Sequence, residues 1–226
     1  MLITPASSGA IIKSHLIKKK TGNSISSTTP IIIYEKWLEF ISIVITIGIL
    51  LFWADFLESK IIFIMGLVLA VISFFIFKNL VGLKIINKIL GRFGIFKNSV
   101  VNMDEFREST STLLKTRNLF ELLSITIVIK VISLASLFLI FQSLNVQINF
   151  FESGQIFYTS TLIGIMSFLP GGLVVTEAGL LGMLLKKGID ISSATLLVLL
   201  LRLVTNWIPV ILGFIALKIS LNQKND

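Results

Sequence analysis

Two ionisable side chains, Glu177 and Arg202, stand in strongly apolar surroundings in the C-terminal part of the chain. A charge within a membrane segment is costly and marks a functional site by default. Glu177 follows Pro170 by seven residues. Its carboxylate would pair with a cation such as Arg202, or contact a substrate amine or a coupling proton. A solvated glutamate at the membrane surface is the alternative. The planar guanidinium of Arg202 suits a phosphate, and a structural ion pair is the alternative there.

Helix-breaking residues precede Glu177 in the stretch LPGGLVVTEAGLLG, residues 169–182. Pro170, Gly171 and Gly172 interrupt an apolar run. In hydrocarbon, a non-helical backbone persists only where protein or a water-filled cavity covers it. The stretch therefore predicts a re-entrant turn, and its proline and two glycines belong to the candidate site.

Polar residues continue along the helix expected to carry Arg202. Thr205, Asn206 and Pro209 follow it at spacings of three, four and seven residues, so the four share one helical face. Pro209 removes a backbone donor, which predicts a kink and a free carbonyl at Thr205. This polar face, with Asn206 as a candidate substrate ligand, is expected to look into the bundle.

A second charged group, Glu35, Lys36 and Glu39, lies in the first apolar segment. The two glutamates are four residues apart on one helical face, and Lys36 and Glu39 have the spacing of an ion pair. Trp37 places the group near the membrane surface, where aromatic side chains gather. Substrate contact and plain anchoring both remain open for these candidates.

The residues that usually carry catalysis or bind metals are scarce. The chain has no cysteine and one histidine, His15, and no cluster of histidine and acidic residues suggests a metal site. It also lacks a glycine-rich phosphate loop. We expect no catalytic residues, no metal, no cofactor and no autonomous enzyme. The net charge of +8 comes from Lys and Arg beside apolar segments, which follows the positive-inside rule rather than nucleic-acid binding.

Membrane helices are the elements that must position these residues. Of the 226 residues, 54% are hydrophobic and 14% are charged, against roughly a quarter charged in soluble domains. We expect an all-α, polytopic transmembrane helix bundle that forms a single integral membrane domain over residues 1–226. Five apolar segments stand out, the fourth of them short: Pro30–Trp53, Ile61–Phe77, Leu119–Phe141, Ile156–Leu169 and Ala194–Leu217.

Loop charges orient these segments. Residues 78–118 hold eight Lys or Arg against three Asp or Glu, so this basic loop is predicted to be cytoplasmic. The connections at 54–60 and 144–155 are net acidic and are expected to face outward.

The two ends of the chain resemble each other, which predicts an internal repeat. TPASSGAIIKSHLIKKKTGNSISST, from Thr4, and LPGGLVVTEAGLLGMLLKKGIDISSA, from Leu169, share an order of features. Each runs from a proline through small residues and an apolar stretch to a lysine cluster, a glycine and Ser-Ser. The offset of 166 residues also places Lys36 on Arg202.

Repeat one would cover residues 1–60 and repeat two residues 155–220. Each is expected to contain a re-entrant or broken-helix element, as in transporters. If residues 156–187 form one hairpin, the repeats are inverted; if residues 156–169 span fully, they are parallel. The loop charges do not decide between these arrangements.

LPGGLVVTEAGLL followed by GIDISSATLLVLLLRLVTNWIPVILGFIAL resembles the signature of the lysylphosphatidylglycerol synthase transmembrane region, a family of flippase-like membrane proteins. TPASSGAIIKSHLIKKKTG followed by YEKWLE resembles its upstream block. The resemblance implies a lipid-handling protein, in some members the flippase half of an enzyme that aminoacylates phosphatidylglycerol. Ser7 and Ala10 stand where the family has arginine and glutamate. Glu35, Lys36 and Glu39 match a Glu-Arg-x-x-Asp block with conservative replacements. The family's leading helices are missing, so we expect an N-terminally short member.

From these residues we expect a flippase-like, multi-pass protein of the cell membrane that handles or translocates a phospholipid or polyprenyl-linked lipid. Its partners would be membrane lipids, anionic or phosphate-bearing, and not nucleic acid. Half-helix N-termini and Arg202 would hold the phosphate, and Glu177 would sense a cationic group or a proton. Two alternatives stay open. One is a membrane subunit of a lipid aminoacyl- or glycosyl-transferase system, with a synthetase or glycosyltransferase partner; the other is a non-transporting scaffold.

Overall fold

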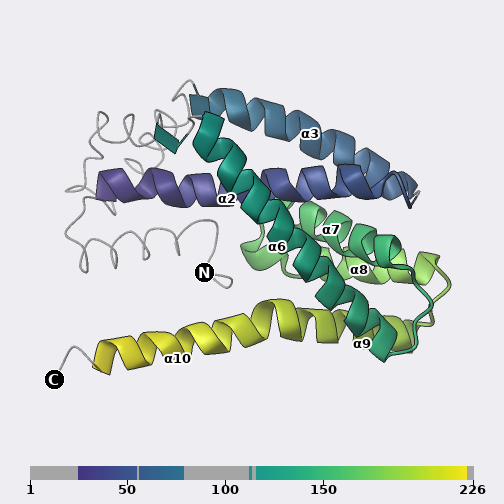
Figure 1. Ribbon diagram of the computed structural model, residues 1–226. Coiled ribbons are helices and arrows are strands. Elements are labelled where there is room, and N and C mark those ends of the chain that lie inside the picture. Colours follow the sequence, from purple (N-terminus) through teal and green to yellow (C-terminus); the bar gives the residue numbers. More distant parts are fainter. Residues whose placement is uncertain (1–24, 55, 79–111, 114–115, 223–226) are drawn as a thin grey trace.

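The computed structural model describes residues 25–54, 56–78, 112–113 and 116–222. These residues form helices and no strand, which confirms the predicted all-α class. The helices, in chain order, are α2 (Ile25–Leu50), α3 (Leu57–Lys78), α6 (Thr116–Ser143), α7 (Phe150–Met166), α8 (Val175–Lys186), α9 (Ile191–Arg202) and α10 (Ile208–Asn222) (Figure 1).

Long apolar helices give the molecule its membrane character. Within the described residues, three stretches are long and apolar enough to cross a membrane, namely Leu57–Ile76, Arg117–Ser143 and Ile191–Ala216. Large hydrophobic side chains along them are exposed, as at Ile64 on α3 and Ile132 on α6. A soluble monomer rarely exposes apolar patches of this extent. The bundle is therefore that of a polytopic helical membrane protein, as predicted.

The α7 and α8 helices form a hairpin that enters and leaves the bundle at one end. Lys187, just after α8, pairs with Glu152 in the first turn of α7, and Lys186 pairs with Glu58 at the start of α3. The 12 residues of α8 rise only about 18 Å, short of the ~30 Å hydrocarbon thickness. The short segment predicted at 156–169 is thus one arm of a re-entrant hairpin and not a full span.

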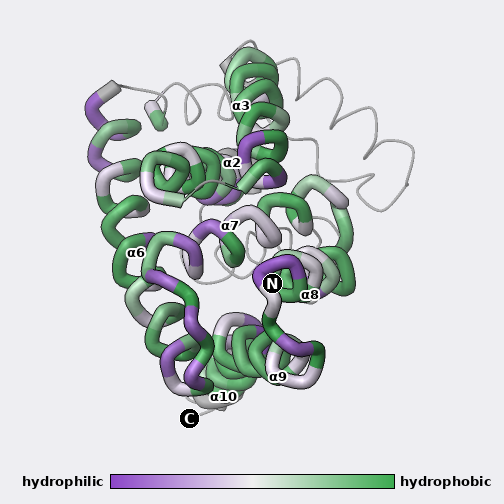
Figure 2. Tube along the Cα trace, turned by 90° about the vertical axis from the view of Figure 1, so that its right-hand side faces the viewer, coloured by the Kyte–Doolittle hydropathy of each residue, from purple (hydrophilic) through white to green (hydrophobic). Residues whose placement is uncertain are grey.

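The α7 helix occupies the centre of the bundle, where α2, α3, α6 and α8 all contact it. Figure 2 shows its polar residues enclosed by largely apolar neighbouring helices. Tyr158 and Leu162 of α7 pack with Ile43 and Ile47 of α2 in one buried apolar cluster. Because neighbouring helices surround α7, the chain can break its helical backbone within the bundle.

The α2 helix and the continuous α9–α10 passage run in opposite directions (Figure 1). These are the helices that follow the two proposed turns, and their opposite directions support the inverted arrangement of the repeat. Residues 1–24, which include the first proposed turn, lie outside the described residues. Residues 79–111 of the basic loop lie outside them as well. The repeat itself therefore stays a prediction.

Candidate functional site at the hairpin turn

The turn between α7 and α8 is built from residues with left-handed backbone. Pro170–Gly172 forms a short 3-10 turn, in which Gly171 and Gly172 have φ of 62° and 63°. Phe168 and Val174 also have positive φ, 55° and 69°. That region is unfavourable for residues with a Cβ, and strained backbone of this kind is characteristic of functional sites.

The turn lies directly against α7. A Cβ built on Gly172 would be 2.5 Å from Thr176 Oγ1, and one built on Gly164 would be 3.3 Å from the Gly172 Cα. Only glycine permits this approach of one backbone to another. The second glycine of the PGG sequence therefore both forms the turn and seats it on α7.

The turn brings Glu177 and Arg202 together. Arg202 Nε lies 2.6 Å from Glu177 Oε1, and the two side chains are 12% and 30% exposed. Arg202 Nη2 also donates to the Gly172 carbonyl at 3.3 Å. The ion pair that the sequence suggested is therefore present, and it joins the first turn of α8 to the last residue of α9.

Asn206 completes the polar contacts of Arg202. With its amide oriented to satisfy both neighbours, its oxygen accepts from Arg202 Nη1 at 2.7 Å and its nitrogen donates to the Thr205 carbonyl at 3.2 Å. Nη1 and Nη2 of Arg202 thus donate to an amide oxygen and a backbone carbonyl, whereas Nε is in ion-pair contact with Glu177 Oε1 and is buried without a hydrogen-bond partner.

A π-helical turn, Leu203–Trp207, separates α9 from α10. The Ile208 N–H donates to the Leu203 carbonyl, five residues back. Pro209 has no N–H to give to Thr205, which is the acceptor that regular α-helical spacing would assign to it. The amide of Asn206 takes that place. The sequence predicted a kink here; the observed feature is a π turn, of the kind that recurs at functional sites.

The electrostatic environment of Glu177 is strongly asymmetric. Glu177 lies in the first turn of α8, where the helix dipole favours a negative charge. The residue before that helix, Val174, gives it no side-chain cap. One carboxylate oxygen faces Arg202, whereas the other, Oε2, is buried without a hydrogen-bond partner. The carboxylate is thus held from one side only.

The charged group on α2 forms a separate ion pair. Lys36 Nζ lies 2.6 Å from Glu39 Oε2, and both side chains are about half exposed. Trp37 Nε1 donates to Ser73 Oγ on α3 at 3.0 Å, and its ring stacks on Phe74. Glu35 is exposed. The Trp37 contacts join α2 to α3, and the choice between anchoring and substrate contact stays open for the charged group.

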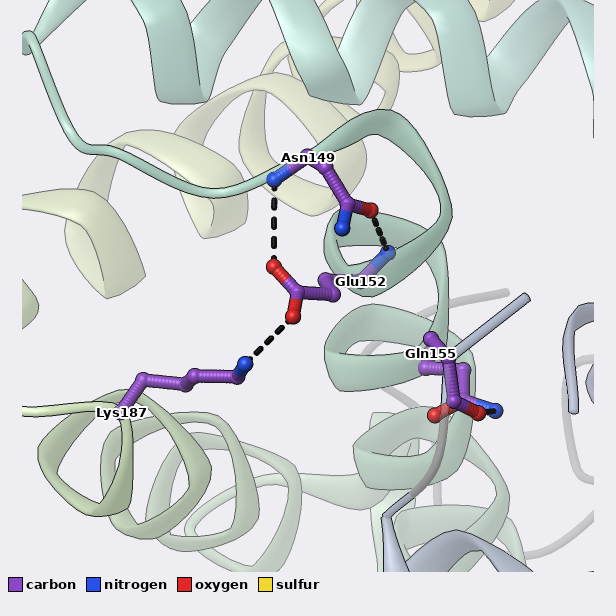
Figure 3. A network of polar contacts seen from close by, with 5 residues as sticks. Asn149, Glu152, Gln155 and Lys187 are labelled. Carbon is purple, nitrogen blue, oxygen red and sulfur yellow. Dashed lines mark hydrogen bonds and ion pairs between the residues drawn. The ribbon is translucent and has the colours of Figure 1, made fainter.

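Sequence reasoning missed the polar contacts that close the hairpin at its base. Figure 3 shows Asn149 and Glu152 capping α7 while Lys187 reaches Glu152. The Asn-x-x-Glu spacing at 149–152 is a recognisable capping box and was the available signal. Gln155, one turn further along α7, donates to the Ala54 carbonyl at 2.7 Å. No local pattern indicated that contact, because its partners are 101 residues apart.

This architecture defines a class of protein, the polytopic helical membrane proteins. Its distinguishing feature is a strained re-entrant hairpin that an Arg–Glu ion pair connects to the next helix. The chain belongs to the family described as the lysylphosphatidylglycerol synthase TM region, whose model matches residues 1–213. Its departures at Ser7 and Ala10 lie outside the described residues.

Two membrane proteins are similar to this chain along most of its length. UPF0104 membrane protein MJ1078 of Methanocaldococcus jannaschii is 27% identical, over 94% of this chain and 90% of the relative. UPF0104 membrane protein PH1989 of Pyrococcus horikoshii is 24% identical, over 91% of this chain and 68% of the relative. No solved structure matches this chain.

Proposed function

We propose that this chain is a flippase-like protein of the cell membrane that handles an anionic phospholipid or a polyprenyl-linked phosphate lipid. The observation that supports this proposal is the largely buried Arg202–Glu177 pair, placed where the hairpin turn and the π turn both break the helical backbone. Broken helices with charged side chains at their ends are the substrate sites of many membrane transporters.

A lipid phosphate would bind the Arg202 guanidinium in place of the Glu177 carboxylate. The planar guanidinium binds phosphate and carboxylate with the same two-pronged geometry. Glu177 would then be displaced by the headgroup and return when the lipid leaves. The uncapped N-terminus of α8 beside Arg202 adds a partial positive charge that favours the same anion. Membrane lipids with phosphate headgroups are therefore the proposed partners.

Lipid scrambling in vesicles tests this proposal. Purified protein is reconstituted with fluorescent phosphatidylglycerol, and dithionite quenching reports the lipid that changes leaflet. We expect Arg202→Ala to slow movement about tenfold or more, because a hydrogen bond to a charged group contributes about 1.5–3 kcal/mol. Glu177→Gln should alter the rate as well, because it removes the competing carboxylate.

Arg117→Ala is the matched control, since Arg117 is 87% exposed and its ion pair among the described residues is with Glu121 on its own helix. It should scramble like the unaltered protein. Activity equal to the unaltered protein in both Arg202→Ala and Glu177→Gln would remove these residues from the mechanism. Fluorescent phosphatidylcholine provides a second comparison, because its headgroup carries no net charge.

A further inference from the structure

A second polar cluster lies buried between α7 and the connection from α2 to α3. Gln155 and Thr159 are four residues apart and project from the same side of α7. Gln155 Nε2 donates to the Ala54 carbonyl at 2.7 Å, and Thr159 Oγ1 donates to Ser59 Oγ at 2.9 Å. Gln155, Thr159 and Ser59 are fully buried. Figure 3 shows Gln155 turned away from the Glu152–Lys187 pair.

One acceptor of this cluster has no donor among the described residues. Oε1 of Gln155 is buried and has no hydrogen-bond partner. Thr159 uses its one hydroxyl proton on Ser59, which leaves lone pairs on both hydroxyl oxygens. Beside Ser59, one oxygen of Glu58 pairs with Lys186, while Oε2 is buried without a partner. Desolvated acceptors left unpaired are costly. A cation bound beside Gln155 would give this buried amide oxygen a partner.

We propose that this oxygen cluster binds one monovalent cation, Na⁺. Its ligands would be Gln155 Oε1, the Ala54 carbonyl and the hydroxyl oxygens of Ser59 and Thr159, with Glu58 supplying negative charge. Ala54 lies in the unwound segment after α2, and transporters coordinate Na⁺ with carbonyls of such segments.

The chemistry of the ligands distinguishes Na⁺ from other cations. Protein sites for divalent cations rely on carboxylates, and Ca²⁺ takes six to eight oxygen ligands. Here the oxygens come from an amide, a carbonyl and two hydroxyls, and Glu58 is the carboxylate that the described residues place next to Ser59 in the chain. The described part of the chain holds no group of three or more His, Cys, Asp or Glu that would bind a metal. A bound Na⁺ would join α7, and with it the re-entrant hairpin, to the α2–α3 connection.

Thermal unfolding of the purified full chain in detergent tests the site without any measure of lipid transport. NaCl is titrated against choline chloride at constant ionic strength, because the exposed Lys186–Glu58 pair is itself sensitive to salt. A ligand that binds only the folded state raises the Tm with its concentration. We expect a saturable rise in Tm with Na⁺, and a smaller one with K⁺ at equal concentration.

Two substitutions locate the binding to this cluster. Gln155→Met preserves the length of the side chain but removes its oxygen, and should abolish the Na⁺ response. Thr159→Val keeps the shape and removes one ligand, so it should weaken the response even if Gln155→Met fails to fold. Gln142→Met and Thr195→Val are the controls, because both residues are exposed elsewhere in the bundle. Each should keep the response of the unaltered protein.

Three results would overturn the proposal. The first is an equal Tm in NaCl and choline chloride for the unaltered protein. The second is a Na⁺ response that persists unchanged in Thr159→Val and in a folded Gln155→Met. The third is a Tm that responds to pH but to no cation, which would assign the orphan acceptors to a proton on Glu58. None of these results depends on whether the chain moves lipid.

Discussion

Gly164 and Thr176 face each other across the hairpin, where its two arms are in contact. A Cβ on Gly164 would lie 1.9 Å from Thr176 Oγ1, and Thr176 is 3% exposed. The hydroxyl therefore occupies the volume that any side chain at position 164 would need. The hairpin can close only because this residue of α7 is a glycine.

We expect Gly164→Ala to lower the free energy of unfolding by about 1–3 kcal/mol, the usual cost of overpacking. Unfolding in detergent, followed by circular dichroism, measures the change. Gly182→Ala is the control on α8, because a Cβ there would meet nothing within 4 Å. That variant should be neutral or slightly stabilising, since alanine favours the helix. A Gly164→Ala protein as stable as the control would contradict the close packing.

The Arg202–Glu177 pair should show thermodynamic coupling. Arg202→Met leaves the Glu177 carboxylate without its cation, and Glu177→Gln leaves Arg202 with two neutral acceptors. We expect each single change to destabilise the protein and the double variant to lose less than their sum. The coupling energy should be about 0.5–3 kcal/mol in a double-mutant cycle. Additive effects would show that the pair contributes nothing of its own.

Cysteine labelling tests the hairpin topology directly, because the chain contains no cysteine of its own. Gln147, before α7, and Ser192, at the start of α9, are both exposed. Single-cysteine variants at these positions should react with an impermeant maleimide from one side of the membrane. Arg117→Cys, at the start of α6, should react from the other side. Opposite labelling of positions 147 and 192 would mean that residues 150–187 span the membrane.

The cap of α9 should make stability depend on pH in the acid range. Asp190 accepts a hydrogen bond from the Ser193 N–H at 2.9 Å, and this bond lowers the pKa of Asp190 from 3.8. Because the unfolded chain binds the proton more readily, the stabilisation is complete above that value. It is lost as the pH falls through the lowered pKa. Asp190→Asn still caps the helix but does not ionise. Its Tm should therefore fall less steeply below pH 3.8 than that of the unaltered protein.

Much of the fold could be predicted from local pattern. Apolar runs located the long helices with bounds up to six residues off, closest for Leu119–Phe141 inside α6 and furthest for α7, because hydrophobic length is set by the bilayer. The helix-breaking PGG sequence likewise indicated the turn. The π turn could not be predicted from the sequence. Pro209 indicates that the helix is disturbed, but it does not indicate which hydrogen bonds replace the one that proline cannot form.

The candidate site was only half visible in the sequence. Glu177 and Arg202 stood out because charge is rare in apolar segments, and the structure joins them. The buried contact of Gln155 with Ala54 depends instead on how α7 packs against a distant connection. Ser59 and Thr159 are equally ordinary as sequence, since hydroxyl residues within membrane helices commonly bond to their own backbone. Only the tertiary arrangement turns these residues into a cluster of acceptors.

The re-entrant hairpin has a consequence for the path of the whole chain. Because α7 and α8 begin and end on one side, they add no crossing, and α6 is followed by α9–α10 as if the hairpin were absent. In the described residues, α2 and α3 run in opposite directions, and so do α6 and α9–α10. The end of α10 therefore returns to the side on which α2 begins (Figure 1). Loss of the hairpin would therefore leave the orientation of the other described helices unchanged.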